Sequence, residues 1–237
     1  MKNSKTRINY KKLVLSHNST PVAGFTILEL MIAAMVFAVI LLIVATGTIS
    51  FTNSYYSGIT RSNVQSVARS IMSEVSQSIE FSTTGSLYTL SPVNVGTGVV
   101  DGYCIANTMY SYELGIEVVS PPSSSSTDDQ GYHGLEVDSN AKCSSGASPN
   151  LSQNQGLPQH VQELLNQHMR LGTFDITQQS GNLYIIHIRV IYGDNVVLNN
   201  IPASLGDPLW SSVGCVSNAG SFCAVSDLTT SVEQRII

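Results

Sequence analysis

One continuous apolar run constrains the fold of this chain more than any other feature. From Phe25 to Ala45 all 21 residues are apolar except Thr26 and Glu29, and none is proline, lysine or arginine. About 20 such residues, in a helix that rises about 1.5 Å per residue, span the roughly 30 Å core of a bilayer. The apolar region of a secretory signal is shorter, about 7–15 residues. We therefore expect a transmembrane helix at 25–45. Secretion with cleavage near Ala45-Thr46-Gly47 is the alternative.

Charge is distributed unevenly on the two sides of this run. Five Lys or Arg and no acid precede it, whereas six Lys or Arg and all 16 acidic residues follow it or lie within it. Basic side chains favour the cytoplasmic side of a membrane. We therefore expect the basic segment 1–24 to stay inside while the rest is exported. An acidic exported part argues against a broad basic surface for nucleic acid and leaves room only for a local patch.

The helical pattern continues beyond the apolar run. Apolar residues recur at spacings of three and four among Ser, Arg, Gln and Glu, as in an amphipathic helix with one apolar stripe. The stripe consists of Val64, Val67, Ala68, Ile71, Val75 and Ile79. Gly58 is the only residue between Thr48 and Phe81 that strongly weakens a helix. We expect one helix from about Phe25 to about Phe81, with its second part, 46–81, lying on a sheet.

The start of the apolar run carries a specific pattern. Gly24 is followed by Phe25-Thr26-Ile27-Leu28-Glu29 and then by apolar residues. This resembles the cleavage and methylation site of type IV prepilins and pseudopilins. The resemblance covers roughly 30 residues. It implies cleavage between Gly24 and Phe25 by a prepilin peptidase and N-methylation of Phe25. It also makes Glu29 the assembly glutamate, at the fifth position of the mature chain.

Physical chemistry is consistent with that role for Glu29. A carboxylate in the first helical turn is favoured by the helix dipole and by the free N–H groups there. An acid at membrane depth costs at least about 2.5 kcal/mol, which an ammonium partner in low dielectric can offset. The resemblance implies that the partner is a terminal amine, its own or that of a neighbouring subunit. Glu29 would then set the register of packed helices. The alternative is an acid that reaches water at the membrane surface.

The resemblance also implies a location and partners. The chain would sit in the cytoplasmic (inner) membrane as a single-pass protein with a cytoplasmic N-terminus and would later enter an extracellular filament. Its partners would be other pilin or pseudopilin subunits, the prepilin peptidase and methyltransferase, and an inner-membrane assembly platform. Thr46 and Gly47 stand where many major pilins carry a helix-kinking proline. This difference favours a minor pilin or pseudopilin.

The exported part, 82–237, has a β-rich pattern. Short apolar alternations at 86–90, 103–106 and 112–119 predict strands. The segment Pro158 to Arg170 has apolar residues at helical spacing and a proline suited to a first turn, which predicts a short helix. Polar segments 121–130 and 139–156 predict surface loops.

The strongest β signal lies at 173–194. Two strand-like runs flank Gln179-Ser180-Gly181-Asn182, which predicts a hairpin. In the second run Tyr184, Ile186, Ile188, Val190 and Tyr192 form one apolar set, which we expect to face the long helix. Residues 228–236 favour either a final strand or a short helix. With the resemblance, these patterns predict an α+β fold in which a long N-terminal helix packs on an antiparallel β-sheet, as in pilins.

Four cysteines lie beyond the apolar run, at 104, 143, 215 and 223. An even number on the exported side suggests disulfides, and four cysteines allow three pairings. We favour Cys215–Cys223, because the short loop contains turn-forming Asn218 and Gly220. Cys104–Cys143 then follows by elimination. Free buried thiols are the alternative. The spacing matches no zinc pattern.

No catalytic motif stands out, and we expect neither enzymatic activity nor a cofactor. Gly96-Thr97-Gly98 with Gly102 lacks the spacing of a dinucleotide site and reads as a loop. The sequence contains no GxSxG, HExxH or P-loop pattern. His187 lies within a strand-like run and favours a packing role or contact with water.

The pattern also favours no metal site. His160, Glu163 and His168 lie on the predicted short helix, where histidines eight residues apart are too distant for one ion, so a solvated face is favoured. Asp128-Asp129 in the serine-rich loop offers carboxylates for calcium but lacks the EF-hand spacing.

Three functional hypotheses remain. The first is a structural subunit, a minor pilin or pseudopilin of a type IV pilus-like or type II secretion-like filament. The second is a binding module on the same scaffold, whose loops 121–130 and 139–156 contact DNA, a surface or a secreted substrate. The third is a membrane-anchored exported enzyme, which no group of residues supports.

Overall fold

The computed structural model describes residues 24–235 except 84, 96–97, 120–131, 142, 145 and 153–156. The chain divides into two compact units, Met1–Thr48 and Ile49–Ile237. Helix α1 (Ile27–Glu80) is 54 residues long and contributes to both units. Its bounds agree with the single helix predicted for about 25–81, and Gly58 does not interrupt it. The predicted basic segment 1–24 lies outside the described residues except for Gly24.

In the second unit, one face of α1 is buried. The buried residues recur at intervals of three or four, and they are Val64, Ala68, Ile71, Met72, Val75 and Ile79. They belong to the main hydrophobic core together with residues from the two larger β-sheets described below. The amphipathic continuation predicted from the sequence is therefore confirmed, because its stripe is the face that packs.

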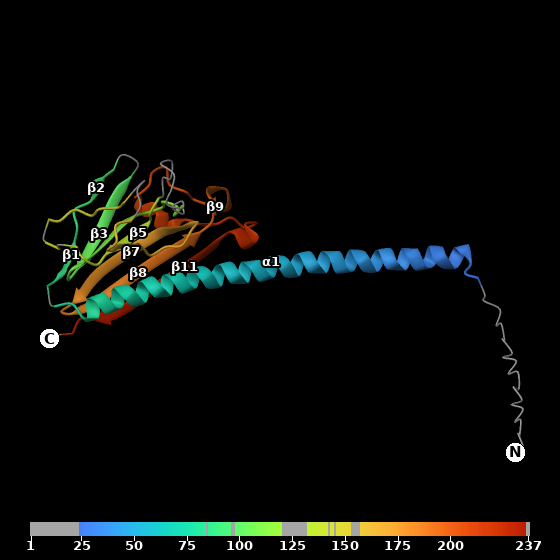
Figure 1. Cartoon of the computed structure of the whole chain (residues 1–237), viewed down its shortest axis with the longest axis horizontal. Coiled ribbons are helices and arrows are strands. Elements are labelled where there is room, and N and C mark those ends of the chain that lie inside the picture. Colours follow the sequence, from blue (N-terminus) through green and yellow to red (C-terminus); the bar gives the residue numbers. More distant parts are fainter. Residues whose placement is uncertain are drawn as a thin grey trace, which may run out of the picture. The chain divides into compact units, whose positions relative to one another are not determined.

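Part of this core is a twisted antiparallel sheet against which α1 packs (Figure 1). Among the described residues its strands are β7 (Met169–Ser180), β8 (Leu183–Tyr192) and β11 (Ala224–Glu233), in the order β11-β8-β7. Gly181 and Asn182 join β7 to β8, with Gly181 at a φ of 54°. A positive φ is easily adopted by glycine and suits such a tight turn. The predicted hairpin is confirmed, and 228–236 belongs largely to a strand rather than to a helix.

The two faces of β8 differ as the alternation predicts. Tyr184, Ile186, Ile188 and Val190 are at most 4% exposed and belong to the same core as the α1 face. Tyr192 packs against that core from its edge. On the opposite face, His187 Nε2 lies 2.7 Å from Asp227 Oδ1 on the neighbouring strand. The His187 ring therefore contacts a carboxylate at the surface of the sheet.

A second antiparallel sheet precedes these strands in the chain. In the described part its order is β1-β3-β4-β5-β6, with β2 paired to β3. The strands are β1 (Leu87–Thr89), β2 (Val93–Asn94), β3 (Val99–Ile105), β4 (Thr108–Glu113), β5 (Leu135–Asp138) and β6 (Val161–Glu163). The predicted strand at 112–119 is shifted, because β4 begins earlier and ends at Glu113. Tyr110 of β4 also contacts α1 through a 2.8 Å hydrogen bond between its hydroxyl and Ser78 Oγ.

The predicted helix at Pro158–Arg170 is wrong. Val161–Glu163 forms β6, which pairs with β5, and Met169 already belongs to β7. Leu165 is buried, and the backbone N–H of Leu164 donates to Leu135 O at 2.9 Å. The apolar spacing that suggested a helix instead serves a strand and a turn, because pairing with β5 overrides a weak local preference.

Irregular segments around a smaller core complete the second unit. They contain 3-10 turns η1 (Asn195–Val197), η2 (Pro208–Ser212) and η3 (Gly220–Phe222) and strands β9 (Leu198–Asn199) and β10 (Gly214–Cys215). Trp210 is 2% exposed in this core. After β11, Gln234 Nε2 donates to Ser82 Oγ at 2.6 Å, and Arg235 pairs with Glu80. The end of the last strand is therefore fastened to the end of α1.

Candidate functional site

The candidate processing segment lies at the start of α1. Gly24, Phe25 and Thr26 precede the helix and are exposed. Thr26 caps it, because Thr26 Oγ1 accepts a hydrogen bond from the Glu29 N–H at 3.2 Å. Glu29 lies in the first turn, and its carboxylate forms no ion pair with any residue that the structure describes.

The sequence around this cap gives Glu29 a candidate local role that the sequence analysis missed. Thr26 at the cap and Glu29 three residues later match the capping-box pattern S/T-x-x-E. That pattern could have been read from the sequence. Glu29 therefore has two candidate roles, in capping its own helix and in pairing with an ammonium. An experiment on this residue has to separate them.

The part of α1 in the first unit presents an apolar surface. All of its residues from Ile27 to Val44 are exposed within this single chain. Its exposed large side chains include Ile27 at 83% and Met35 at 73%, and Phe25 just before the helix is 81% exposed. Within the described residues, α1 is the one helix long and apolar enough to cross a membrane. Such a surface needs lipid or other helices as neighbours.

Hydroxyl groups on this part of α1 are satisfied within the helix. Thr46 Oγ1 donates toward Leu42 O and Ile43 O, each at 3.0 Å. Thr48 Oγ1 donates to Val44 O at 2.8 Å. A buried hydroxyl without a partner is costly in an apolar medium. These bonds therefore make the threonines compatible with lipid or with a helix bundle.

The four cysteines form two disulfides, Cys104–Cys143 and Cys215–Cys223. The first connects β3 to the segment after β5, and the second connects β10 to the residue before β11. They are the pairs favoured from the sequence.

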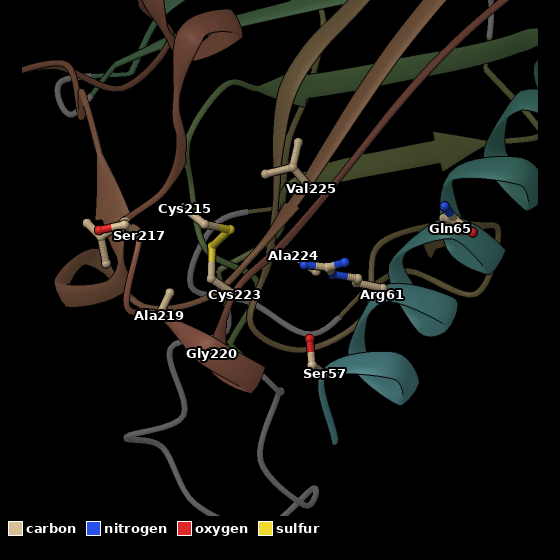
Figure 2. Close-up of a pocket in the computed structure, with 11 residues that line it drawn as sticks. Ser57, Arg61, Gln65, Cys215, Ser217, Ala219, Gly220, Cys223, Ala224 and Val225 are labelled. Atoms are coloured by element: carbon tan, nitrogen blue, oxygen red, sulfur yellow. A yellow bond between two sulfur atoms is a disulfide. The ribbon is translucent and has the colours of Figure 1, made fainter. Parts of the chain in front are cut away.

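A polar groove of about 500 Å³ lies between α1 and the Cys215–Cys223 loop. Ser57, Arg61 and Gln65 line one wall at intervals of four residues along the helix, and the disulfide loop forms the other wall (Figure 2). Arg61 is exposed and forms no ion pair with the described residues. The groove is lined by the cationic Arg61 and by the neutral polar side chains Ser57, Gln65 and Ser217.

The structure separates His160, Glu163 and His168, which the sequence analysis placed on one helix. Glu163 lies on β6 and is largely buried, and it accepts hydrogen bonds from Gly134 N at 2.8 Å and Leu165 N at 2.8 Å. The expected solvated face is therefore wrong for Glu163. His160 remains exposed and lies 3.7 Å from Asp138 Oδ2.

His168 instead joins a cluster that the sequence did not indicate. Its Nδ1 lies 2.9 Å from Glu117 Oε1 and 3.8 Å from Asp194 Oδ1. Candidate ligand atoms of these three residues all lie within 4.8 Å of one another. The residues come from three segments, after β4, before β7 and after β8. No spacing in the sequence connects them, because only the pairing of the strands brings them together.

The buried side chain of Arg170 contacts the segments that carry this cluster. It is 3% exposed, and its Nη2 pairs with Glu117 Oε2 and donates to Gly193 O at 3.1 Å. Its Nη1 donates to Asn195 Oδ1 at 2.8 Å and to Gly115 O at 3.3 Å. Burial lowers the pKa of Arg170, and Glu117 and Asp194 oppose that shift. Arg170 therefore ties together the two loops that carry Glu117 and Asp194.

Two further acids are buried in the sheet of β1 to β6. Glu113 is 0% exposed, neither carboxylate oxygen has a hydrogen-bond partner among the described residues, and burial raises its pKa. Glu136 is 2% exposed, and burial raises its pKa to about 7. The hydrogen bond from Ser152 N and the electrostatic interaction with His133 act in the opposite direction and lower the pKa. These groups were not singled out from the sequence, because only the fold determines which acids become buried.

Two features raised in the sequence analysis fall outside the described residues. They are Gly96-Thr97 and the acidic pair Asp128-Asp129, with most of the serine-rich loop. The described parts of 139–156 contain no helix or strand, as expected for a loop.

Comparisons with known protein families, with curated proteins and with solved structures find no match. The structure itself defines an α+β protein with one long N-terminal helix. That helix is apolar in its first part and packs on an antiparallel sheet through its second part, an arrangement that resembles pilins.

Proposed function

We propose that this chain is a structural subunit, a minor pilin or pseudopilin, of a type IV pilus-like or type II secretion-like filament. The observation that carries the proposal is the sequence Gly24 to Glu29 at the start of a helix whose first part exposes a continuous apolar surface. Lipid and a bundle of like helices both provide apolar neighbours for a helix of this kind.

Processing is the first step of the proposed function. A prepilin peptidase cleaves between Gly24 and Phe25, and the new amine of Phe25 is methylated. The exposure of Gly24 and Phe25 and their position before the helix support this step, because a peptidase needs an accessible and extended backbone. Before cleavage, the basic segment 1–24 keeps the N-terminus on the cytoplasmic side of the inner membrane.

Assembly is the second step, and it works by packing rather than by catalysis. The apolar part of α1 leaves the lipid for the apolar surfaces of other subunits, so its side chains stay out of water. The assembly platform and the neighbouring pilin subunits are the partners in this step. The second unit, with its acidic surface and two disulfides, faces outward.

Glu29 sets the axial register of that bundle. Its carboxylate pairs with the N-terminal ammonium of a neighbouring subunit, and a shift along the helix would leave both charges unpaired in low dielectric. Support comes from its position in the first turn and from the lack of an ion-pair partner in the described part of its own chain.

Glu29→Gln tests this role, because glutamine keeps the capping-box pattern but lacks the charge. We expect Glu29→Gln to reach the membrane normally and to reduce incorporation into filaments at least about tenfold, as for the loss of about 1.4 kcal/mol in assembly. Sheared filaments and membrane fractions are compared by immunoblot.

Two control variants make the result specific. Glu233→Gln changes an exposed acid on β11 and should assemble as wild type. Glu29→Asp retains a charge and should recover part of the incorporation. Normal assembly of Glu29→Gln would remove the register role and leave Glu29 as a helix cap.

A further inference from the structure

We propose that Glu117, His168 and Asp194 form a binding site for a divalent first-row transition-metal ion, with Zn²⁺ as its representative. The site is independent of filament assembly. It also departs from the sequence analysis, which favoured no metal ligands, because the three residues are adjacent only in the folded chain.

The arrangement around His168 Nδ1 suggests a cation rather than a simple hydrogen bond. Two carboxylates converge on this one nitrogen, Glu117 Oε1 at 2.9 Å and Asp194 Oδ1 at 3.8 Å. A single proton on Nδ1 can serve only one of them well. An ion placed between the three atoms contacts all of them at once.

The distances suit a small ion. Zn–N and Zn–O bonds are about 2.0–2.2 Å, so tetrahedral ligand atoms lie about 3.4 Å apart. The three donor atoms already lie within 4.8 Å of one another, and a bound ion would draw them closer together. One imidazole nitrogen and two carboxylate oxygens are donors that Zn²⁺ accepts, whereas Ca²⁺ and Mg²⁺ prefer oxygen alone.

The site has room and access for the ion. His168, Asp194, Tyr192, Gly193 and Phe222 line a hollow of about 110 Å³. Glu117 does not line this hollow, which lies beside the donor atoms and can hold water molecules for the remaining coordination positions. His168 and Asp194 are exposed, so an ion can enter directly from solvent.

The surrounding contacts hold the ligands in place. Arg170 binds Glu117 Oε2 and thereby leaves Oε1 facing His168. The backbone N–H of His168 donates to Val118 O at 2.9 Å, and the backbone N–H of Gly193 donates to His168 O at 3.1 Å. The backbone of His168 is therefore hydrogen-bonded to the segment that carries Glu117 and to the segment that carries Asp194. Contacts of this kind orient metal ligands and raise affinity.

Charge also favours occupation. Glu117 and Asp194 carry two negative charges, and Arg170 compensates only one of them. With a neutral imidazole the cluster is left with one uncompensated negative charge near the surface. This negative charge attracts a divalent cation at short range.

The test is calorimetric titration of ZnCl₂ into the full chain in detergent, without an affinity tag. Trp210 is the only tryptophan, and the guanidinium carbon of Arg170 lies 5.9 Å from its ring centre, so its fluorescence gives a second readout. We expect one Zn²⁺ per chain and weaker binding of Ca²⁺.

The variants are His168→Asn and Asp194→Asn. Asparagine tolerates the positive φ of 60° at position 168, and at position 194 it removes charge at constant shape. Each should weaken Zn²⁺ binding at least about tenfold, with unchanged far-UV circular dichroism. His160→Asn, at another exposed histidine beside a carboxylate, is the matched control and should bind as wild type.

Several results would overturn the proposal. One is failure of the wild-type chain to bind Zn²⁺, and another is unchanged affinity in His168→Asn and Asp194→Asn, as expected if the ion sat at His187 beside Asp227. Equal loss in His160→Asn would show a nonspecific effect. Tighter binding of Ca²⁺ than of Zn²⁺ would contradict the class of ion.

Discussion

At the scale of single residues, Arg170 connects several segments of the second unit. It is buried and donates to the segments around Gly115, Glu117, Gly193 and Asn195. Its guanidinium also lies over the ring of Trp210. A planar group with several donors can serve these acceptors together, and a lysine ammonium cannot.

Arg170→Lys should therefore destabilise the folded chain by about 2 kcal/mol or more, because buried carbonyl and carboxylate groups lose their donors. Urea unfolding of the full chain in detergent, followed by Trp210 fluorescence, measures the change. Arg61→Lys, at an exposed arginine without an ion pair to the described residues, should shift stability by less than about 0.5 kcal/mol. Equal effects of the two substitutions would contradict the role of Arg170.

Glu113 makes stability depend on pH. Its ordinary pKa is 4.5, and burial raises the folded-state pKa above that value. The unfolded chain therefore loses this proton first as the pH rises. The contribution of Glu113 to stability is fully present below the ordinary pKa of 4.5 and is lost as the pH rises through the folded-state pKa.

Glu113→Gln should remove the loss of folding stability at high pH, because glutamine does not ionise. We expect the free energy of unfolding of the variant to exceed that of wild type by about 1 kcal/mol at pH 8 and to differ little at pH 4. Urea unfolding at both values checks the difference. A variant that is equally destabilised at both pH values would show that Glu113 has a partner that glutamine cannot replace.

Neither residue could have been identified from the sequence. Glu113 falls in a predicted strand and Arg170 at the end of the wrongly predicted helix, and neither pattern shows which charged residue becomes buried. Their environments depend on non-local strand pairing. The start of α1 is different, because Gly24, Thr26 and Glu29 are close in sequence and their geometry is local.

At the scale of elements, the long helix was predicted well. Its periodicity extends over many turns, and five of the six predicted stripe residues are buried, while Val67 is partly buried and Met72 joins the face. The hairpin of β7 and β8 was also predictable, because alternation and a Gly-Asn turn agree there. The segment 158–170 was misread, since a few apolar residues at helical spacing cannot reveal a pairing with β5 across a loop.

The packed face of α1 can be tested by a matched pair of isoleucines. Ile71 is 1% exposed, whereas Ile59 is 47% exposed in the same helix and the same unit. Ile71→Ala should cost about 2–5 kcal/mol, because it removes buried methyl groups and leaves a cavity. Ile59→Ala should cost less than about 1 kcal/mol. Urea unfolding distinguishes them, and equal costs would mean that α1 does not pack through this face.

The two disulfides should contribute unequally. Cys104–Cys143 closes a separation of 39 residues and Cys215–Cys223 one of 8. Loop-closure entropy gives about 4 kcal/mol for the first and about 2.5 kcal/mol for the second. Unfolding of the two double Cys→Ala variants measures these costs. A larger loss for the 215/223 variant would show that the local packing of its loop outweighs chain entropy.

At the scale of the whole molecule, the two units have different physical requirements. The first exposes apolar side chains that need lipid or neighbouring helices, and the second has its own core, disulfides and acidic surface. This division was largely predictable, because hydropathy and charge reveal it directly. The metal-ligand cluster was not, because its residues come from three distant segments.

The central claim is that this chain is made as a precursor and matured for assembly, and its mature N-terminus tests that claim most directly. Intact mass and peptide mass spectrometry should find a chain that begins at N-methylated Phe25, without residues 1–24. A chain that keeps its basic N-terminal segment, or one that begins near Thr48, would contradict the account.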